Sequence, residues 1–479
     1  MLKGKRIRLS LLVAGILFII SGFNITWAES PSSEHPYGWY PGVTLTVAVL
    51  SGVHHIPWRE AGRRFEELTG VKIEVVEFPF SAIYDKLMTE AVSHSGAFDI
   101  MELCNMWVPE FKVGGFILCL DDYVKKWNPN LEDIAEPVKK LMKFGGRYWS
   151  ILLDGDVFLL HYRKDLFEDP KYKKEFKSRY GYELAPPKTW KEYRDMAEFF
   201  TRDTDGDGEI DLWGNTLMLL RVHLPFTFVQ MLKSYGVDYF DPETMEPQIN
   251  SPRAVEALKM LKELVKFMPP GNLTWGYTEV RDAWLRGDVA LMVQWNELCY
   301  ELLDESKVKG KTGYTVVPGT IINEKLYQVS LQAWGWTGVI STDSKNPEAA
   351  YQFLRYVTSP EIMATVFHKG DPKVGSLGYE PWRESEFTHP ALMNFTPASP
   401  EWLQAIQKSM AHGVSDLRIP GGFSYYDALA VEVGEALAGK KTPEQALNDA
   451  AKAWREITRT RGIEAQRKAY REMLGLPVE

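Results

Sequence analysis

The sequence predicts an α/β fold divided into two lobes, and three features of the chain lead to this prediction. Its 479 residues, 45% of them hydrophobic, exceed what one typical hydrophobic core encloses. Its N-terminal part alternates strand and helix patterns, as expected for a parallel sheet covered by helices. Its middle and C-terminal parts carry mostly helical patterns, with a few strands between them.

The alternation of strand and helix is clearest over residues 43–101. The first strand pattern, VTLTVAVL, is an apolar run of the buried type. The segment REAGRRFEELTG places apolar residues at helical spacing and ends in Gly70, which suits a helix C-cap. The other elements expected here are a strand over Val71–Phe78, a helix over Ala82–Ser93 and a strand beginning at Phe98.

The rest of the chain is expected to supply helices and two further strands. The strands are expected over Gly310–Val317 and directly after Trp336. The helices are expected over Trp190–Phe200, Ala254–Met268, Tyr277–Leu285, Pro347–Val357, Pro443–Thr460 and Glu464–Met473.

Residues 1–28 have the pattern of a cleaved secretory signal peptide. Basic residues come first, an apolar run follows over Leu11–Ile20, and small Ala28 offers a cleavage point. The run is shorter than the roughly 18 residues of a membrane-spanning helix. The alternative is an uncleaved N-terminal anchor. Lipid attachment is not expected, because no cysteine follows the run. Residues 29–42, rich in Pro, Ser and Gly, are predicted to form a flexible leader.

Charge and cysteine content narrow the class of protein. The net charge is −9, and it becomes −13 once residues 1–28 and their four basic residues are removed. Such an acidic protein lacks the basic surface that nucleic acid requires, and the same charge disfavours docking on anionic lipid. The three cysteines, Cys104, Cys119 and Cys299, are too few for a disulfide scaffold, although a Cys104–Cys119 bond stays open.

An acidic loop over residues 203–211 is a candidate calcium site. Carboxylates at alternate positions, with Gly208 at the sixth position of the motif, allow side chains to converge on a hard cation. The motif departs from its usual form at position 12, where Gly214 replaces the bidentate glutamate. The alternative is a solvated acidic turn. The candidate ligands are Asp203, Asp205, Asp207, Glu209 and Asp211.

The aromatic content points to a binding pocket. Trp, Tyr and Phe together make up 13% of the chain. Sugar rings stack on flat aromatic side chains, while their hydroxyls need hydrogen-bonding groups. Tryptophans stand beside polar residues at three expected strand ends: Asn105-Met-Trp107, Gln294-Trp295-Asn296 and Gln332-Ala-Trp334. The alternative is that these tryptophans belong to the core.

The sequence patterns for a zinc site and for a catalytic site are weaker than the pattern for a binding pocket. His54 and His55 follow the first strand, with Asp99 and Asp156 elsewhere, but zinc needs three or four ligands and adjacent side chains point apart on extended chain. The sequence contains no HExxH, GxSxG, P-loop or GxGxxG motif. Carboxylates are numerous and their separations are not given by the sequence, so a glycosidase pair stays open at this point. The lack of catalytic motifs favours a binding protein over an enzyme, with no required cofactor.

Seven stretches in order along the chain resemble family 1 extracellular solute-binding proteins, the maltose-binding-protein-like group that serves ABC sugar importers. They are EAGRRFEELTGVKIEVVE, FDIMELCNMWVPEFKVGGFILCLDDYV, DVFLLHYRKDLFED, PPKTWKEYRDMAEFF, WLRGDVALMVQWNEL, GWTGVISTDSKNPEAAYQFLRYVTSP and GGFSYYDALAVEVGEALAGKKTPEQAL. The similarity covers nearly all of the chain after the leader.

This resemblance implies the two-lobed periplasmic-binding-protein fold, in which each lobe is a mostly parallel sheet flanked by helices. It places residues 43–155 and 314–357 in the N-terminal lobe, and residues 156–313 and 358–479 in the C-terminal lobe. The hinge crossings are expected near Leu153–Val157, Thr312–Val316 and Tyr356–Pro360. The ligand is expected between the lobes, at the carboxyl ends of strands.

Carrying the family's contact regions onto this sequence gives a candidate lining for that site. The positions are Ser51, Gly52, His54, His55, Asn105, Trp107, Asp156, His223, Phe226, Gln294, Trp295, Asn296, Trp334, Phe423, Tyr425 and Tyr426. Two histidines in the first loop are unusual for the family, which puts its common malto-oligosaccharides in doubt. The acidic loop is a frequent family feature, which lowers its weight as a metal site.

The resemblance implies a periplasmic or extracytoplasmic monomer that binds a carbohydrate and partners the transmembrane subunits of an ABC permease. The alternatives are a secreted carbohydrate-active enzyme, a metal-binding protein using His54 and His55, and a binding protein for another solute such as a polyamine. A cation could suit Asp156 beside aromatic residues, whereas a phosphate would need arginine or lysine. The expected lining contains neither, so a neutral polyol fits it best.

Overall fold

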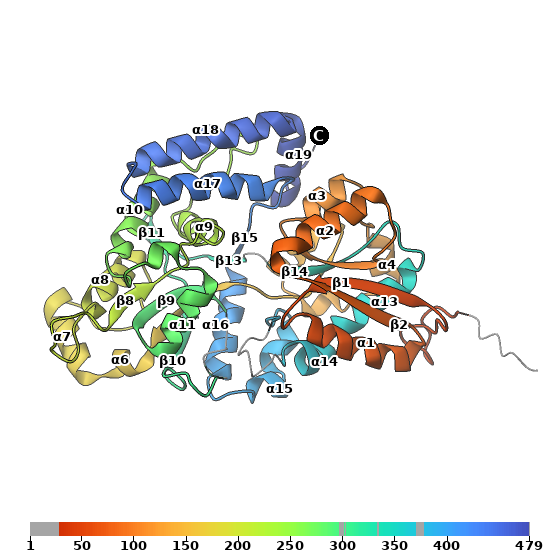
Figure 1. Cartoon of the computed structure of the whole chain (residues 1–479), viewed down its shortest axis with the longest axis horizontal. Coiled ribbons are helices and arrows are strands. Elements are labelled where there is room, and N and C mark those ends of the chain that lie inside the picture. The colour runs from red at the N-terminus through yellow and green to blue at the C-terminus, as the bar shows by residue number, and fades with distance from the viewer. Residues whose placement is uncertain (1–27, 297–300, 302, 333–334, 370–377, 479) are drawn as a thin grey trace, which may run out of the picture.

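A computed structural model shows two lobes side by side (Figure 1). It describes residues 28–296, 301, 303–332, 335–369 and 378–478. The signal peptide predicted for residues 1–28 therefore lies, apart from Ala28, outside the described residues. None of the helices in these ranges has both the length and the hydropathy needed to cross a membrane.

The first lobe is built on a sheet whose strands occur, among the described residues, in the order β2-β1-β3-β14-β6. Strand β1 runs parallel to both β2 and β3, which confirms the predicted parallel unit. Strand β14 runs antiparallel to its neighbours β3 and β6. The bounds are β1 (Thr44–Leu50), β2 (Lys72–Phe78), β3 (Ile100–Cys104), β6 (Ile151–Leu152) and β14 (Trp336–Ile340).

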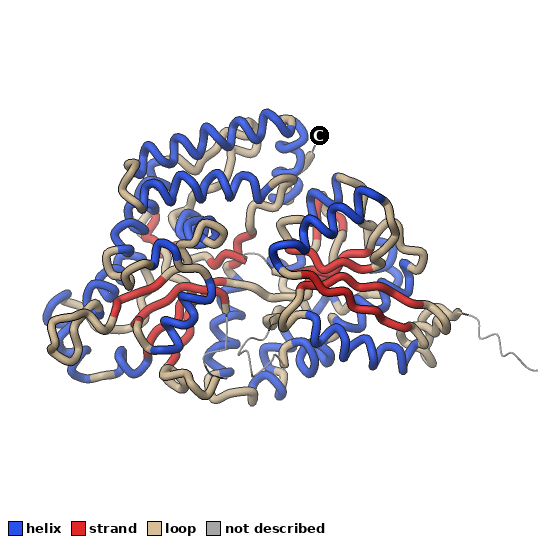
Figure 2. The backbone as a smooth tube through the Cα atoms, in the orientation of Figure 1, coloured by secondary structure: helices blue, strands red, loops and turns tan. Residues whose placement is uncertain are grey.

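Helices cover both faces of this sheet (Figure 2). Aromatic side chains join them below it: Phe65 of α1 meets Phe353 of α13 at 4.9 Å, and Trp58 meets Phe367 at 5.6 Å between ring centroids. The elements are α1 (His55–Thr69), α2 (Phe80–Ser93), α3 (Val108–Val113), α4 (Asp121–Lys126), η1 (Leu131–Asp133), α5 (Glu136–Leu141), the hairpin β4 (Lys143–Phe144) and β5 (Arg147–Tyr148), α13 (Pro347–Val357), α14 (Pro360–Ile362), η3 (Met363–Phe367) and η4 (Glu384–Thr388).

The second lobe is built on a sheet with the strand order β10-β7-β9-β8 within the described chain. Strand β8 runs parallel to β9, whereas β7 runs antiparallel to both β9 and β10. The strands are β7 (Phe158–Arg163), β8 (Trp213–Thr216), β9 (Val289–Trp295) and β10 (Thr312–Val316). A small parallel pair, β13 (Ser330–Gln332) and β15 (Gly413–Ser415), and a hairpin of β11 (Thr320–Ile322) and β12 (Lys325–Tyr327) accompany it.

The helices of the second lobe surround this sheet. In Figure 1, α17, α18 and α19 form the upper part of the lobe. They confirm the helices expected near Trp190, Ala254, Tyr277, Pro443 and Glu464. The elements are α6 (Lys164–Glu168), α7 (Pro170–Tyr180), α8 (Trp190–Phe200), α9 (Leu224–Ser234), α10 (Pro252–Val265), η2 (Asn272–Thr274), α11 (Tyr277–Arg286), α16 (Ser399–Ala411), α17 (Gly422–Leu437), α18 (Pro443–Arg461) and α19 (Ile463–Leu474). The short helix α15 (Pro390–Met393) precedes α16 and also contacts η3 and η4 of the first lobe.

One strand in each sheet runs against the others, and the path of the chain explains why. Strand β7 is the first strand after the chain leaves β6 of the first lobe, and β14 follows the return from the second lobe. Each of these strands enters its sheet from the edge nearest the other lobe. The other strands run the opposite way, so the carboxyl ends of β1, β3 and β9 lie at the edge that faces the partner lobe.

The crossing expected at Leu153–Val157 lies between β6 and β7 as predicted. The side chain of Asn296 holds this segment: its Oδ1 accepts the N–H of Val157 at 3.1 Å, and its Nδ2 donates to the carbonyl of Gly155 at 3.2 Å. The backbone of the crossing is therefore anchored to the end of β9.

The other two expected crossings are wrong. Residues Thr312–Val316 form β10, which pairs with β7 inside the second sheet, so the boundary between residues 313 and 314 cuts a strand. The first lobe also continues past residue 357, because Arg383 donates to the carbonyl of Pro129 at 3.0 Å and Ser385 to Asp133 at 2.7 Å. The chain is back in the second lobe at α16, where Trp402 donates to the carbonyl of Asn296 at 2.6 Å.

The leader predicted as flexible over residues 29–42 is packed against the first lobe. Glu29 and Trp39 form a β-bridge, and the N–H of Tyr40 donates to the carbonyl of Thr69 at 2.7 Å. The ring of Tyr37 lies 5.2 Å from that of Tyr356. Aromatic residues between the prolines and glycines supply this contact, which the loop-like composition concealed.

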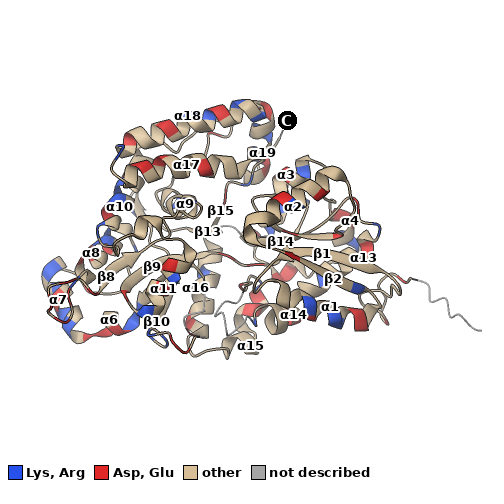
Figure 3. Ribbon diagram, in the orientation of Figure 1, with Lys and Arg blue, Asp and Glu red and all other residues tan. Residues whose placement is uncertain are grey.

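The surface helices carry charges of both signs, and two of the three cysteines lie in the described residues. Acidic and basic segments alternate along α1 and α18 (Figure 3), which gives these surface helices a mixed charge. No disulfide joins Cys104, which is buried in β3, to Cys119, which is partly exposed, so the bond left open from the sequence does not form. Cys299 lies outside the described residues.

Candidate functional site

A cavity of about 240 Å³ lies between the two lobes, at the carboxyl ends of strands. The first lobe, the crossing segment and the second lobe all contribute to its wall. Its lining residues are Leu50, His54, Phe80, Asp154, Asp156, Val222, His223, Tyr277, Trp295, Trp336, Gly378 and Glu380.

A buried hydrogen-bond network supports the first-lobe wall. Glu102 on β3 is fully buried, and its carboxylate accepts from the backbone N–H of Leu50 at 2.8 Å and from the hydroxyl of Tyr379 at 2.6 Å. It also lies 3.0 Å from Nδ1 of His54. Because Glu102 can only accept when ionised, it holds the proton on Nδ1 and fixes the plane of this imidazole against the cavity.

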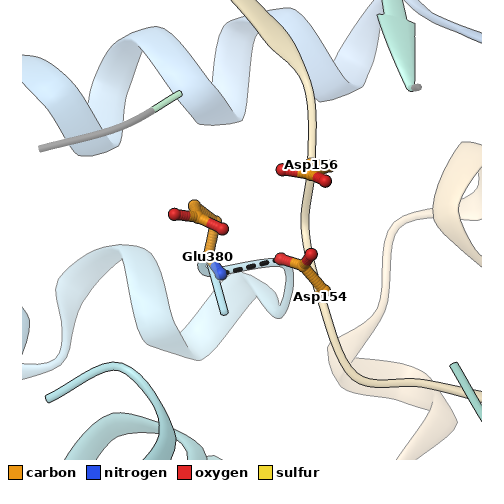
Figure 4. A group of neighbouring side chains, drawn as sticks. All are labelled: Asp154, Asp156 and Glu380. Atoms are coloured by element: carbon orange, nitrogen blue, oxygen red, sulfur yellow. Dashed lines mark hydrogen bonds between the residues drawn. The ribbon is translucent and has the colours of Figure 1, made fainter. Parts of the chain in front are cut away.

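Three carboxylates meet where the crossing segment passes the first lobe (Figure 4). Asp154, Asp156 and Glu380 each offer an oxygen, and these oxygens lie within 4.8 Å of one another. Two hydrogen bonds bring the segments together: the side chain of Asp154 accepts the N–H of Glu380 at 2.8 Å, and the N–H of Gly155 donates to the carbonyl of Glu380 at 3.0 Å. Burial raises the pKa of Asp154 above its ordinary value.

Aromatic rings form the wall on the second lobe. Trp295 ends β9, and its ring lies 6.0 Å from that of His223, at the start of α9, and 6.4 Å from that of Tyr277, at the start of α11. On its other side Trp295 packs on Phe158 at 5.3 Å. The tryptophan is therefore fixed by its neighbours and presents a ready-made apolar surface.

The charged side chains among the described lining residues are carboxylates. Burial lowers the pKa of His223, so this imidazole is neutral at neutral pH. The described residues that line the cavity include no lysine or arginine. The cavity therefore combines hydrogen-bond acceptors of negative charge with aromatic rings.

A second cavity, of about 400 Å³, adjoins the first, and Phe80 lines both. It lies between α2 and α3 of the first lobe and the start of α17 in the second. An ion pair between Glu110 and Arg461, at 3.4 Å, joins the lobes beside it. Its lining residues are Phe80, Ser81, Tyr84, Met106, Trp107, Glu110, Gly421, Gly422, Phe423, Ser424 and Arg461.

The family follows from a comparison with known protein families. The model of the bacterial extracellular solute-binding proteins matches residues 52–364, more than half of the chain. The chain belongs to this family. The match begins in the loop after β1 and ends within η3, so it includes most of the segments that line the cavity.

Individual relatives agree with this assignment. A probable amino-acid ABC transporter periplasmic-binding protein of Sinorhizobium fredii is 25% identical over 471 residues, which cover 94% of this chain and 97% of the relative. Among solved structures, a ribitol-bound solute-binding protein of Agrobacterium radiobacter aligns with a TM-score of 0.70 at 23% identity. The alignment covers all of that protein and 88% of this chain.

A maltose-bound MalE3 of T. maritima aligns equally well, with a TM-score of 0.70 at 23% identity. The alignment covers 87% of this chain and all of that protein. These structures share the two-lobed fold, with sheets flanked by helices. The family and these neighbours are binding proteins rather than enzymes.

Of the lining predicted from sequence, the structure brings four residues together in the first cavity of this solute-binding protein: His54, Asp156, His223 and Trp295. Trp107 and Phe423 line the second cavity instead. Ser51 and Gly52 form the turn after β1 and do not line either cavity. Trp334 lies outside the described residues.

Histidines 54 and 55 are separated by their surroundings. Nδ1 of His55 lies 3.0 Å from Glu77 at the end of β2, whereas His54 pairs with Glu102. Adjacent side chains diverge here, at the start of α1, so the structure does not form the zinc pair considered as an alternative.

The remaining predicted residues are buried behind the lining residues or elsewhere in the packing. Phe226 packs on Trp295, with 6.2 Å between ring centroids, and Asn296 anchors the crossing segment. Asn105 and Gln294 are buried at the cavity-facing ends of β3 and β9. Tyr426 donates to Asp416 at 3.1 Å and Tyr425 contacts Thr458 at 3.0 Å, so both belong to the packing of α17.

Sequence reasoning missed much of the lining. Asp154 stands two residues before the predicted Asp156, and Trp336 stands two residues after the predicted Trp334. Side chains two positions apart on an extended segment point the same way, so both residues could have been predicted from these neighbours. Glu380 has no such local signal, because only its pairing with the distant crossing segment brings it to the cavity. The others are Leu50, Phe80, Val222, Tyr277 and Gly378.

The acidic loop lies on the second lobe between α8 and β8, away from both cavities. Oxygens of Asp203, Asp205 and Asp211 lie within 4.8 Å of one another. Backbone N–H groups of Gly206 and Gly208 donate to Asp203 and hold its pKa below the usual value. The structure does not bring the other two predicted ligands into this group, and Asp207 instead accepts the N–H of Glu209 at 2.8 Å.

Proposed function

We propose that the chain is the extracytoplasmic substrate-binding protein of an ABC importer, which captures a mono- or oligosaccharide or a related polyol. The observation that carries this proposal is the cavity between the lobes. Aromatic rings there, led by Trp295 and Tyr277, can stack on the apolar faces of a sugar. His54, Asp154 and Asp156 can bond its hydroxyls. The ribitol and maltose complexes among the structural neighbours support this ligand class.

Binding would draw the lobes together. A solute between His54 of the first lobe and Trp295 of the second makes its full set of contacts only when the lobes are close, so it favours the closed state by its higher affinity for that state. The closed monomer would then present surfaces of both lobes to a membrane permease and release the solute chemically unchanged. We propose no nucleic-acid partner.

A second candidate ligand comes from the relative in Sinorhizobium fredii, which is named for amino-acid transport. The ammonium group of an amino acid would suit the three carboxylates. Its carboxylate would need a basic partner, and the described cavity lining contains no lysine or arginine. We therefore rank a free amino acid below a hydroxylated solute.

A thermal-shift screen against sugars, polyols and amino acids tests the proposal. A solute that binds only the folded protein raises its melting temperature with concentration. We expect saturable stabilisation by a carbohydrate or polyol, which is recovered intact after prolonged incubation. Recovery of cleaved carbohydrate would instead identify a secreted enzyme.

Export is a further part of the proposal. The basic and apolar pattern of residues 1–28 would direct the chain across the cytoplasmic membrane and would then be removed, without attachment of lipid. Mass determination of the protein purified from its extracytoplasmic compartment tests this. A mature chain that begins near Glu29 supports cleavage, and a chain that retains Met1 contradicts it.

We also propose a structural calcium site in the loop over residues 203–211. The carboxylates of Asp203, Asp205 and Asp211 supply oxygens of the type that calcium prefers. We expect calcium to raise the melting temperature relative to EGTA, and we expect Asp211→Asn to reduce this rise. An identical melting temperature with calcium and with EGTA would show that the loop is only a solvated turn.

A further inference from the structure

The second cavity continues the first one along the cleft between the lobes. The two cavities share Phe80 in their walls, and their volumes are about 240 and about 400 Å³. Sites for small organic ligands usually measure roughly 300–1,000 Å³, so the first cavity alone is small for such a site. The cleft therefore offers a solute a second compartment that is larger than the first.

Ion pairs between the lobes flank this second compartment. Glu110 on α3 of the first lobe pairs with Arg461 at the end of α18 at 3.4 Å. Lys112 on the same short helix pairs with Glu472 on α19. In Figure 1, α3 of the first lobe faces α17 and α19 of the second. Because the lobes already touch beside the cavity, its volume is not an open gap that hinge motion would simply fill.

Aromatic rings of both lobes line the second cavity. Phe80, Tyr84 and Trp107 belong to the first lobe, and Phe423 belongs to the second. Phe80 is 45% exposed and Phe423 is 42% exposed. Large apolar side chains that stay exposed on both sides of one groove indicate a ligand that covers them. Flat rings of this kind stack on the apolar faces of a sugar unit.

Polar groups in the same wall favour a sugar unit over a purely apolar group. Ser81 and Ser424 contribute hydroxyls, and the Glu110–Arg461 pair contributes both acceptors and donors. An apolar group in this place would remove water from these side chains without replacing its hydrogen bonds, which costs free energy. The charges of the pair are opposite, so a neutral unit with several hydroxyls suits this compartment.

We infer that the natural solute is an oligosaccharide of at least two units, with one unit in each cavity. This inference rests on the proposed function, because it concerns the size of the ligand in the same cleft. The first unit lies against His54 and Trp295, the second lies between Trp107 and Phe423, and the link between them passes Phe80. A single sugar or polyol in the first cavity would forgo all contacts of the second.

Sugars of increasing length test this inference. Isothermal titration calorimetry of the full chain compares D-glucose with maltose and cellobiose, and D-xylose with xylobiose, and includes D-mannitol as a polyol of one unit. Each probe is titrated into the wild type, Phe423→Ala and Ser81→Trp. Ser81 is exposed on the first turn of α2 and lines the second cavity, so a tryptophan there occupies this space without displacing a core residue.

Each variant has a matched control. Tyr327→Ala removes a ring with an exposure of 40%, close to that of Phe423, and Tyr327 lines neither cavity. Ser93→Trp places the same large ring on α2, at an exposed serine near the other end of the helix that also lines neither cavity. All four substituted side chains are exposed, so the variants should melt as the wild type does.

We expect at least one disaccharide to bind the wild type and both controls about 10-fold or more tightly than the monosaccharide that composes it, the scale of one added stacking contact. Phe423→Ala should weaken binding of this disaccharide by about 5-fold or more, and Ser81→Trp should remove most of its advantage. Affinity for the monosaccharide should stay within about 2-fold of the wild type in both variants, because the first cavity is unchanged.

The other outcomes contradict the inference in distinguishable ways. A wild type that binds a monosaccharide or mannitol as tightly as any disaccharide would overturn the two-unit solute and leave the proposed carbohydrate function intact. A disaccharide advantage that survives in Phe423→Ala and Ser81→Trp would overturn the use of the second cavity, again without touching the proposed function. A panel in which no sugar or polyol binds would overturn both.

Discussion

Replacing Trp295 by alanine is expected to weaken solute binding by about 1–3 kcal/mol, the scale of a lost aromatic contact in a binding site. Trp295 ends β9 and lines the cavity, and Phe158 and Phe226 pack behind it. The substitution removes an indole ring that the second lobe offers to the solute. Titration calorimetry with a solute found in the screen measures the change.

Two controls make this result specific. Trp295→Phe keeps an aromatic face and should lose less affinity. Tyr327→Ala removes a 40% exposed ring on β12, outside both cavities, and should bind as the wild type does. Unchanged affinity in Trp295→Ala would show that the solute binds elsewhere. The corresponding substitution of Trp334, also predicted from sequence, concerns a residue outside the described structure.

Replacing Glu102 by leucine is expected to lower the free energy of unfolding by about 3–5 kcal/mol, the scale of a buried charged group removed from its partners. The carboxylate is fully buried and serves the N–H of Leu50, the imidazole of His54 and the hydroxyl of Tyr379. Leucine fills the volume but leaves all three without an acceptor. Urea denaturation followed by circular dichroism measures the loss.

Glu102→Gln provides the comparison. Its amide oxygen can still accept one or two of these hydrogen bonds, so the stability loss should be clearly smaller. Solute affinity should fall in both variants, because His54 is no longer held in one orientation. A leucine variant as stable as the wild type would show that the network contributes little to the first lobe.

The sequence was sufficient to predict most of the fold. The apolar run before Leu50, the C-cap at Gly70 and the helix at Pro347–Val357 are local signals, and the structure has these elements where expected. The crossings were harder, because only the long-range pairing of β10 with β7 places Thr312–Val316 inside the second sheet. The packed leader was missed for the same reason, since only contacts such as Tyr37 with Tyr356 reveal it.

The site was predictable where it follows strand ends. His54, Asp156 and Trp295 each come close after a strand or stand at its end, and all three line the cavity. Glu380 could not be predicted, because it is held at the cavity by long-range hydrogen bonds, one from its N–H to the side chain of Asp154 and one from the N–H of Gly155 to its carbonyl. Tyr425 and Tyr426 were predicted wrongly as lining residues, since an aromatic pair on a helix is equally suited to packing between helices.

The central claim is that one intact solute lies between the lobes and contacts both of them. A crystal structure of the protein with the solute that stabilises it most in the screen tests this directly. The account predicts an unaltered molecule within contact distance of His54 from the first lobe and of Trp295 from the second. A cleaved molecule in the cavity, or a solute held by one lobe alone, would contradict it.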